Sequence, residues 1–129
     1  MKVGIIGCGL IGKKRALILN PKDLIAVADI DLKKTELFKG INQNVLVFTE
    51  WNKVLSIKEI ELIIIATTND LLSEITYEAV KANKHVIVEK PAAKNYIELE
   101  RIISALKDSK SKVKVGFNHR YHPSLKKAY

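Results

Sequence analysis

The sequence has 129 residues, the size of one domain, and such a domain buries enough surface to fold without disulfides or structural metals. Its 47% hydrophobic and 28% charged residues are typical of an ordinary soluble protein, and its single cysteine, Cys8, excludes an intrachain disulfide. The net charge of +8 comes mainly from lysines scattered along the chain. Because they form no recognisable nucleic-acid-binding motif, we expect no nucleic-acid partner.

Short apolar runs alternate with longer segments of helical periodicity along the chain. The runs span residues 3–6, 24–28, 45–48, 62–66, 85–88 and 113–117. Two helical faces are predicted between them, one formed by Leu71, Ile75, Ala79 and Ala82 and the other by Leu99, Ile102, Ile103 and Leu106. Alternating strands and helices imply right-handed βαβ units. We therefore predict an α/β fold of the Rossmann type, a doubly wound parallel sheet with helices on both faces.

A glycine-rich turn follows the first apolar run and opens the helical segment 10–19. Its letters, Gly7-Cys8-Gly9-Leu10-Ile11-Gly12, match G-x-G-x-x-G in the strand-turn-helix context that the motif requires. Gly7 permits the tight turn, Gly9 lets a pyrophosphate approach the backbone, and Gly12 allows close packing of helix and strand. With Leu10 and Ile11 at the helix N-terminus, these glycines are predicted to bind the pyrophosphate of a dinucleotide. The alternative is a glycine-rich turn that binds nothing.

Cys8 lies inside this turn. A thiol near a helix N-terminus can have a lowered pKa, which would make Cys8 reactive. The alternative, which we favour, is that a small residue is needed there for fit.

Asp29 ends the second apolar run, 22 residues after Gly7, close to the spacing of a ribose-binding acid. A carboxylate there accepts hydrogen bonds from ribose hydroxyls and repels a 2′-phosphate, so NAD is favoured over NADP. Either Asp29 or Asp31 could instead cap the next helix, and we assign Asp31 to capping and Asp29 to the ribose. Lys33 and Lys34 follow closely and could tolerate a 2′-phosphate.

Glu89-Lys90-Pro91 follows the fifth apolar run, at the carboxyl end of a predicted strand, where ligands bind in open parallel sheets. A lysine in this place can orient a substrate hydroxyl or stabilise a developing alkoxide. Taken alone, the tripeptide would be a solvated pair of charges before a turn.

The tripeptide is not alone. Together, residues 7–12, Asp29, residues 66–69, residues 89–91 and residues 116–120 resemble the Gfo/Idh/MocA oxidoreductase family over essentially the whole chain. The resemblance implies an NAD(P)-binding domain at residues 1–122, and a helix starting at residues 123–129 that connects to a missing C-terminal substrate domain. It also implies sugar, nucleotide-sugar or cyclic-polyol substrates and a homo-oligomer at full length.

The resemblance also assigns residues. It makes Lys90 the active-site lysine and implies cofactor contacts for Glu89, Thr67, Thr68, Asn69, Asn118 and Arg120. In the segment after the fourth run, Thr68 stands where the family often has proline, and Leu72 where it often has histidine, which suggests altered contacts near the cofactor.

The family's catalytic histidine belongs to the second domain, and nothing in this sequence matches it. His85 begins a buried run and is interpreted as structural, and His119 and His122 as surface or junction residues.

The sequence thus predicts an NAD(H)-dependent oxidoreductase represented by its cofactor-binding domain and inactive as this fragment. The alternative is a stand-alone NAD(H)-binding sensor or regulatory module. Charges and glycines interrupt any apolar segment at the N-terminus, and the longest apolar run is too short to span a bilayer. We therefore expect a cytoplasmic protein with no membrane partner.

Overall fold

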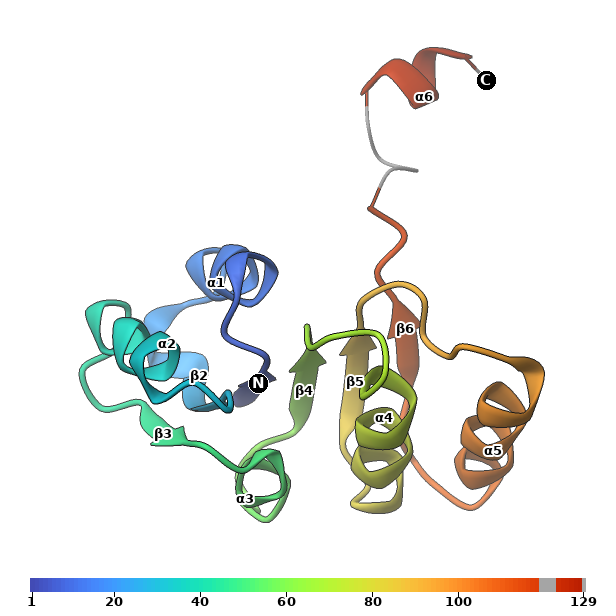
Figure 1. The fold of residues 1–129 in the computed structure, drawn as a ribbon, viewed down its shortest axis with the longest axis horizontal. Coiled ribbons are helices and arrows are strands. Elements are labelled where there is room, and N and C mark those ends of the chain that lie inside the picture. The colour runs from blue at the N-terminus through green and yellow to red at the C-terminus, as the bar shows by residue number, and fades with distance from the viewer. Residues whose placement is uncertain (119–122, 129) are drawn as a thin grey trace.

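Six parallel strands form one sheet in the order β3-β2-β1-β4-β5-β6 (Figure 1). The computed structural model describes residues 1–118 and 123–128. The strands are β1 (Val3–Ile6), β2 (Leu24–Ala28), β3 (Leu46–Phe48), β4 (Leu62–Ile65), β5 (His85–Val88) and β6 (Val113–Val115). This strand order is that of a Rossmann-type doubly wound sheet, and the predicted fold class is confirmed.

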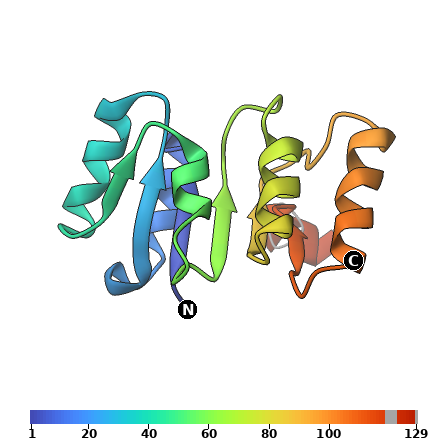
Figure 2. The same ribbon diagram turned by 90° about the horizontal axis from the view of Figure 1, so that it is seen from below.

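Helices join the strands on both faces of the sheet (Figures 1 and 2). They are α1 (Leu10–Leu17), α2 (Leu32–Glu36), α3 (Trp51–Leu55), α4 (Leu72–Lys81), α5 (Tyr96–Lys107) and α6 (Pro123–Ala128), with short 3-10 helices η1 (Pro21–Asp23) and η2 (Leu37–Gly40). A helix does begin at Pro123, as the sequence predicts.

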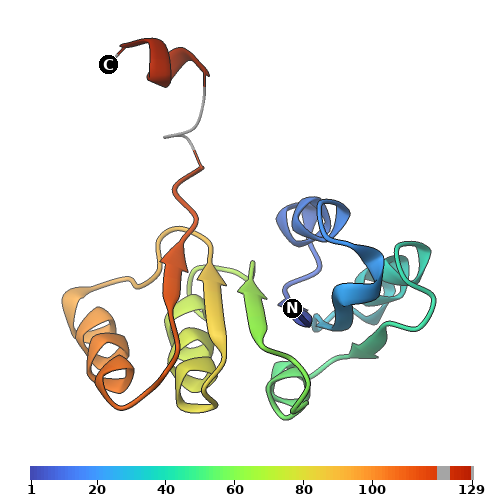
Figure 3. The ribbon, with the colours of Figure 1, turned by 180° about the vertical axis from the view of Figure 1, so that it is seen from behind.

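One core layer lies between the sheet and α3, α4 and α5. Seen from behind in Figure 3, β4, β5 and β6 lie in front of α4 and α5. The layer buries alternate strand residues such as Ile63 and Ile65 against Val54 of α3 and Ile75 of α4. The second core layer, on the opposite face, packs Ile5 and Val27 against Ala16 of α1 and Phe38 of η2. Strands covered on both faces need apolar side chains at successive positions, which explains their unbroken apolar runs.

The sequence places β1, β2 and β5 at their observed bounds and extends the other three runs beyond the strands. Residues 66 and 116–117 leave the sheet at its carboxyl edge and begin the loops there. Ala66 and Gly116 are half-buried there, whereas Phe117 is exposed. Of these residues, Ala66 lines the pocket at the candidate site, whereas Gly116 and Phe117 line a separate groove.

The two predicted helical faces are only partly right. In α4, Ile75 and Ala79 are buried, but Leu71 precedes the first turn and Ala82 is exposed after the last. In α5, Ile102 is buried and Leu106 half-buried, whereas the other two members of the predicted face, Leu99 and Ile103, are exposed. The reason is position, because α5 covers the edge of the sheet and packs along one side of α4.

Candidate functional site

A pocket of about 310 Å³ lies at the carboxyl ends of β1, β2 and β4. This is the switch point of the sheet, because the chain winds outward from β1 through β2 and β3 and then returns to continue on the other side with β4. The pocket is lined by Ile6, Gly7, Gly9, Ala28, Asp29, Ile30, Lys34, Thr49, Trp51, Ala66, Thr67, Thr68 and Leu71. Open α/β sheets bind ligands in the crevice at this point, which makes the pocket the candidate site.

The three glycines of the turn meet three different steric demands. Gly7 has a φ of 95°, and a Cβ there would overlap the backbone of Ala66. A Cβ on Gly12 would overlap the carbonyl oxygen of Gly7, so this glycine permits close contact between α1 and the turn. A Cβ on Gly9 would meet no protein atom within 4 Å. Gly9 therefore borders open space, as the approach of a ligand requires.

The N-terminus of α1 faces this space without a side-chain cap. Gly9 is the N-cap residue, and its helix has no acidic residue in the first turn. The side chains of Leu10 and Ile11 are exposed and do not line the pocket, so only their backbone groups can serve a ligand there. Free N–H groups and the positive end of a helix dipole fit the two negative charges of a pyrophosphate.

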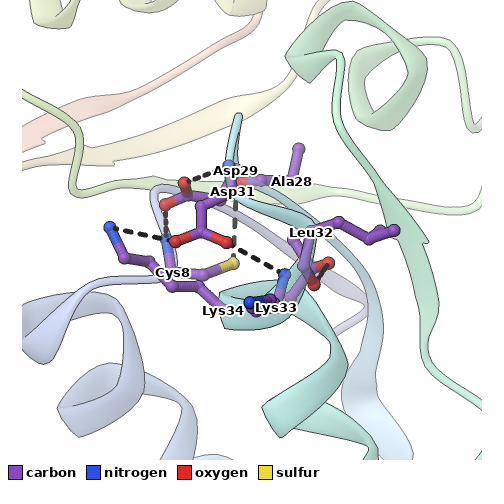
Figure 4. Close-up of polar contacts among 8 residues, drawn as sticks. Cys8, Ala28, Asp29, Asp31, Leu32, Lys33 and Lys34 are labelled. Atoms are coloured by element: carbon purple, nitrogen blue, oxygen red, sulfur yellow. Dashed lines mark hydrogen bonds and ion pairs between the residues drawn. The ribbon is translucent and has the colours of Figure 1, made fainter.

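Asp29 lies in the pocket with both carboxylate oxygens held by backbone groups (Figure 4). The Cys8 N–H donates to Oδ2 at 2.8 Å, and the Asp31 N–H donates to Oδ1 at 2.9 Å. Asp31 is the N-cap of α2, because its Oδ1 accepts a hydrogen bond from the Lys33 N–H at 3.0 Å. The capping role predicted for Asp31 is confirmed, and Asp29 is left with its carboxylate fixed at the pocket wall.

Lys34 brings the only charge besides Asp29 to the pocket lining. Its Nζ lies 3.9 Å from Oδ2 of Asp31, and its side chain is half-exposed. Lys33 does not line the pocket. Of the two lysines named by the sequence, Lys34 is therefore the one placed to meet a 2′-phosphate.

Sequence reasoning missed three uncharged members of the lining, Thr49, Trp51 and Leu71. All three follow β3 or β4 at the same carboxyl edge; Thr49 and Trp51 lie in a segment that matches none of the motifs considered, and Leu71 lies at an unassigned position of the segment after β4. A signal was available, since every segment that directly follows a parallel strand reaches this edge. Trp51 is also the single tryptophan of the chain.

The loop after β4 contributes Thr67 and Thr68 to the pocket, whereas Asn69 is exposed and outside its lining. Asp70 follows, and a hydrogen bond from the Thr68 side chain is the main cause that lowers the pKa of its carboxyl group. Leu72 was expected to alter contacts near the cofactor, and it lies outside the pocket lining. Leu72 begins α4 and is fully buried in the core, because the helix turns that position inward, and the neighbouring Leu71 lines the pocket instead.

Glu89 extends β5 and forms an ion pair with Arg15 of α1. The Arg15 Nε donates to Oε1 of Glu89 at 2.9 Å, and Nη2 donates to the same oxygen. Sequence reasoning missed Arg15, since 74 residues separate the partners. Lys90 is exposed directly beyond this pair, in a cis peptide bond with Pro91.

Two of the remaining predicted residues fall near the end of β6. Asn118 is exposed and lines a separate groove with Arg15, Gly116 and Phe117. Arg120 lies outside the described residues, as do His119 and His122. The pocket thus brings together Gly7, Gly9, Asp29, Thr67 and Thr68, while Lys90 and Asn118 lie outside its lining.

The structure decides between the two interpretations of Cys8 and shows the surroundings of His85. Cys8 is buried and its Sγ approaches the Ala28 carbonyl oxygen at 3.5 Å. Burial, with the nearby Asp29 carboxylate, raises the pKa of the thiol to about 12, so the small-residue interpretation holds. The Nδ1 of His85 accepts a hydrogen bond from the Lys112 N–H at 3.1 Å, which agrees with its structural interpretation.

Within residues 1–118 and 123–128, no three metal-binding side chains come close enough together to hold an ion. In the same part of the chain, no helix has the length and apolar character needed to cross a bilayer.

Known proteins match this chain over nearly its whole length. Residues 1–117 match a family model described as an oxidoreductase family with an NAD-binding Rossmann fold. Inositol 2-dehydrogenase of Salmonella paratyphi B is 28% identical over 129 residues, which cover 94% of this chain and 38% of that protein. Levoglucosan dehydrogenase of Pseudarthrobacter phenanthrenivorans is 30% identical over 138 residues, covering 97% and 35%.

Among solved structures, myo-inositol dehydrogenase from Lactobacillus casei in complex with NAD(H) and myo-inositol is 26% identical, with a TM-score of 0.88. The match covers 98% of this chain and 39% of that one. The chain therefore spans little more than a third of the length of the curated relatives it matches.

Proposed function

This chain belongs to the Gfo/Idh/MocA oxidoreductase family, whose model matches it as an NAD-binding Rossmann fold, and we propose that it is the cofactor-binding part of an NAD(H)-dependent oxidoreductase. The proposed substrate is a sugar, a nucleotide sugar or a cyclic polyol. One observation carries the proposal: the open space above Gly9, at the uncapped N-terminus of α1, adjoins the fixed carboxylate of Asp29. A dinucleotide needs a helix N-terminus for its pyrophosphate and, at the end of the next strand, an acid for its ribose.

The adenosine half of the cofactor occupies the pocket. Asp29 accepts hydrogen bonds from the ribose hydroxyls with lone pairs that its two backbone donors leave free. Its charge disfavours a 2′-phosphate, which supports NAD over NADP, while Lys34 opposes this preference without cancelling it. The backbone groups of Gly9, Leu10 and Ile11 bind the pyrophosphate, and Gly12 lets α1 approach closely enough for them to do so.

The residues that would hold the nicotinamide half lie toward the carboxyl ends of β4 and β5. When bound, the nicotinamide ring supplies or accepts the hydride. Lys90 lies at the end of β5, where its ammonium can hold or polarise the substrate hydroxyl. The residues proposed to flank this half are Thr67, Thr68, Asn69, Glu89, Asn118 and Arg120.

The proposal includes a second domain. Residues 1–122 form the cofactor domain, and residues 123–129 begin the helix that connects it to a substrate domain. Support comes from the relatives, which are more than twice as long as the matched part. That domain would supply the histidine that moves the proton and would mediate homo-oligomer formation.

The substrate class is supported by the relatives' own names, an inositol dehydrogenase and a levoglucosan dehydrogenase. Because these relatives are enzymes, they favour turnover over a stand-alone NAD(H) sensor. The proposal places the enzyme in the cytoplasm, and its single buried cysteine supports this location. It includes no nucleic-acid or membrane partner, which agrees with lysines that are scattered along the chain.

Two measurements test the proposal. Calorimetric titration of the 129-residue chain should show saturable binding of NADH and weaker binding of NADPH, and neither cofactor should bind the Gly9→Val variant. The product of the complete gene should then reduce NAD in the presence of myo-inositol or another polyol or sugar. Failure of the wild-type chain to bind either cofactor would contradict the proposal at its first step.

A further inference from the structure

We propose that Arg15 is a positioning residue for the nicotinamide end of the site, acting through its ion pair with Glu89. This inference rests on the proposed function, because it assigns the pair a role toward a bound cofactor. The pair connects α1, whose N-terminus faces the pyrophosphate, to the strand end that carries Lys90.

The contact is directional and shielded. Two N–H groups of the Arg15 guanidinium donate to one oxygen of Glu89, and the side chains are only 23% and 14% exposed. The other ion pairs of the described residues join side chains that are at least about a third exposed. Exposed pairs of that kind contribute little, whereas a shielded, charge-assisted pair holds its partners in one geometry.

The second oxygen of Glu89 is confined as well. A Cβ on Gly116 would lie 3.0 Å from Oε2, closer than an ordinary contact, so the carboxylate lies directly against the backbone that leaves β6. The Glu89 N–H donates to the Ile65 carbonyl at 3.0 Å, and the Gly116 N–H donates to the Val88 carbonyl at 2.8 Å. The carboxylate is therefore clamped between Arg15 and Gly116.

The clamp fixes three segments relative to one another: the phosphate-facing helix, the start of the Lys90 segment, and the segment leading to Asn118. The pyrophosphate and the nicotinamide ring of one cofactor molecule must reach both sides of this junction. Release of Arg15 should therefore leave the adenosine half of the site intact and loosen the nicotinamide half.

The test compares two ligands of the 129-residue chain. NADH requires the whole site, and ADP-ribose carries the adenosine, both phosphates and the second ribose but lacks the nicotinamide ring. In Arg15→Gln we expect the affinity for NADH to fall about tenfold, while the affinity for ADP-ribose stays within about twofold of wild type. The emission of bound NADH should shift toward that of free NADH, since the ring is held less firmly.

Three further variants separate positioning from stability. Lys14→Gln removes an exposed charge from the neighbouring position of α1 and should change neither affinity. Arg15→Lys keeps the charge but loses the two-pronged contact, so it should rescue NADH affinity only in part. Arg15→Gln/Glu89→Gln leaves no unpaired carboxylate, so thermal stability should recover while NADH binding stays weak.

An unchanged ratio of the two affinities in Arg15→Gln would overturn the inference, whether both affinities stay at the wild-type value or fall together. Recovery of NADH binding in the double variant would overturn it too. A wild-type chain that binds neither ligand would instead contradict the proposed function, so the two failures are distinguishable.

Discussion

Asp29 combines two roles in one carboxylate. It faces the pocket where a ribose would lie, and it also holds the glycine turn by accepting the Cys8 N–H. The second role could not be inferred from motif spacing. It explains why the acid at this position is held in place before any ligand arrives.

Replacement of Asp29 should therefore change cofactor choice and overall affinity together. In Asp29→Ser, removal of the negative charge beside Lys34 should lower the ratio of the NADPH to the NADH dissociation constant by about tenfold. Affinity for NADH should also fall, because the ribose contact and the support of the turn are lost. Calorimetric titration with both cofactors measures the ratio.

Asp31→Ser is the matched control, since it changes an acid two residues away that serves as a helix cap. It should alter stability by about 1 kcal/mol at most and leave the ratio unchanged. A wild-type preference for NADPH would show that the role assigned to Asp29 is wrong.

Cys8 should be unreactive near neutral pH. Because its pKa is raised from 9.0 to about 12, its thiolate at pH 8 is about a thousandfold rarer than that of a free cysteine. Iodoacetamide should therefore label the native chain far more slowly than the urea-unfolded chain. The native rate should keep rising with pH above 9, where the rate of the unfolded chain levels off.

The raised pKa of Cys8 also makes the stability of the fold depend on pH. A thiol whose pKa is higher in the folded state holds its proton more tightly there. Its stabilising contribution is present below pH 9.0 and is lost as the pH rises from 9.0 toward 12.

Labelling that is equally fast in the native and unfolded chains at pH 8 would contradict the burial of Cys8.

At the scale of elements, two glycines of the turn between β1 and α1 should have different roles, Gly9 in cofactor binding and Gly12 in stability. Gly9→Val should abolish NADH binding and leave the melting temperature within about 3 °C of wild type, because Gly9 has an extended backbone and open space beside it. Gly12→Val should instead cost about 2 kcal/mol of stability or more, because its side chain meets the Gly7 carbonyl. Thermal unfolding and titration of both variants check the contrast, which fails if the two glycines behave alike.

The strands and helices also show how much of the fold local hydrophobic patterns can predict. Unbroken apolar runs predict β1, β2 and β5 correctly, because a strand buried on both faces admits little else. Helical periodicity misjudges the buried face of α5, since a helix at the sheet edge buries only one side of its apolar surface.

Contacts between segments far apart in the chain cannot be predicted from local sequence patterns. The glycine turn and Asp29 could be found because their chemistry fixes residue type and spacing. The pairing of Arg15 with Glu89 depends on how α1 packs relative to the end of β5. These two residues are 74 positions apart, and no motif spacing predicts their contact.

For the whole molecule, we predict cofactor binding without turnover. In the proposed function the chain supplies one wall of the site, including the exposed Lys90, and it spans little more than a third of the length of its relatives. Hydride transfer requires the substrate carbon to be held against the nicotinamide, and a positioned general base contributes a further 10²–10⁴-fold, roughly. The turnover number of the chain should therefore lie more than about a hundredfold below that of the complete gene product.

The assay uses one substrate for both proteins, with NAD at saturation as judged from the binding titration. A turnover number within tenfold of the complete product would mean that residues of this chain carry the proton chemistry unaided. Binding of NADH by both proteins serves as the control that the cofactor domain is intact.

The bond from the Cys8 N–H to Asp29 has a consequence for how such a domain can evolve. A lineage under selection to use NADP must give up the carboxylate, and in doing so it also gives up the acceptor that orders the phosphate turn. The first substitution therefore lowers fitness for both cofactors unless a second one, which restores an acceptor for that N–H, is already present. We expect change of cofactor in this scaffold to follow a constrained order of mutations, with the supporting change ahead of the change at position 29.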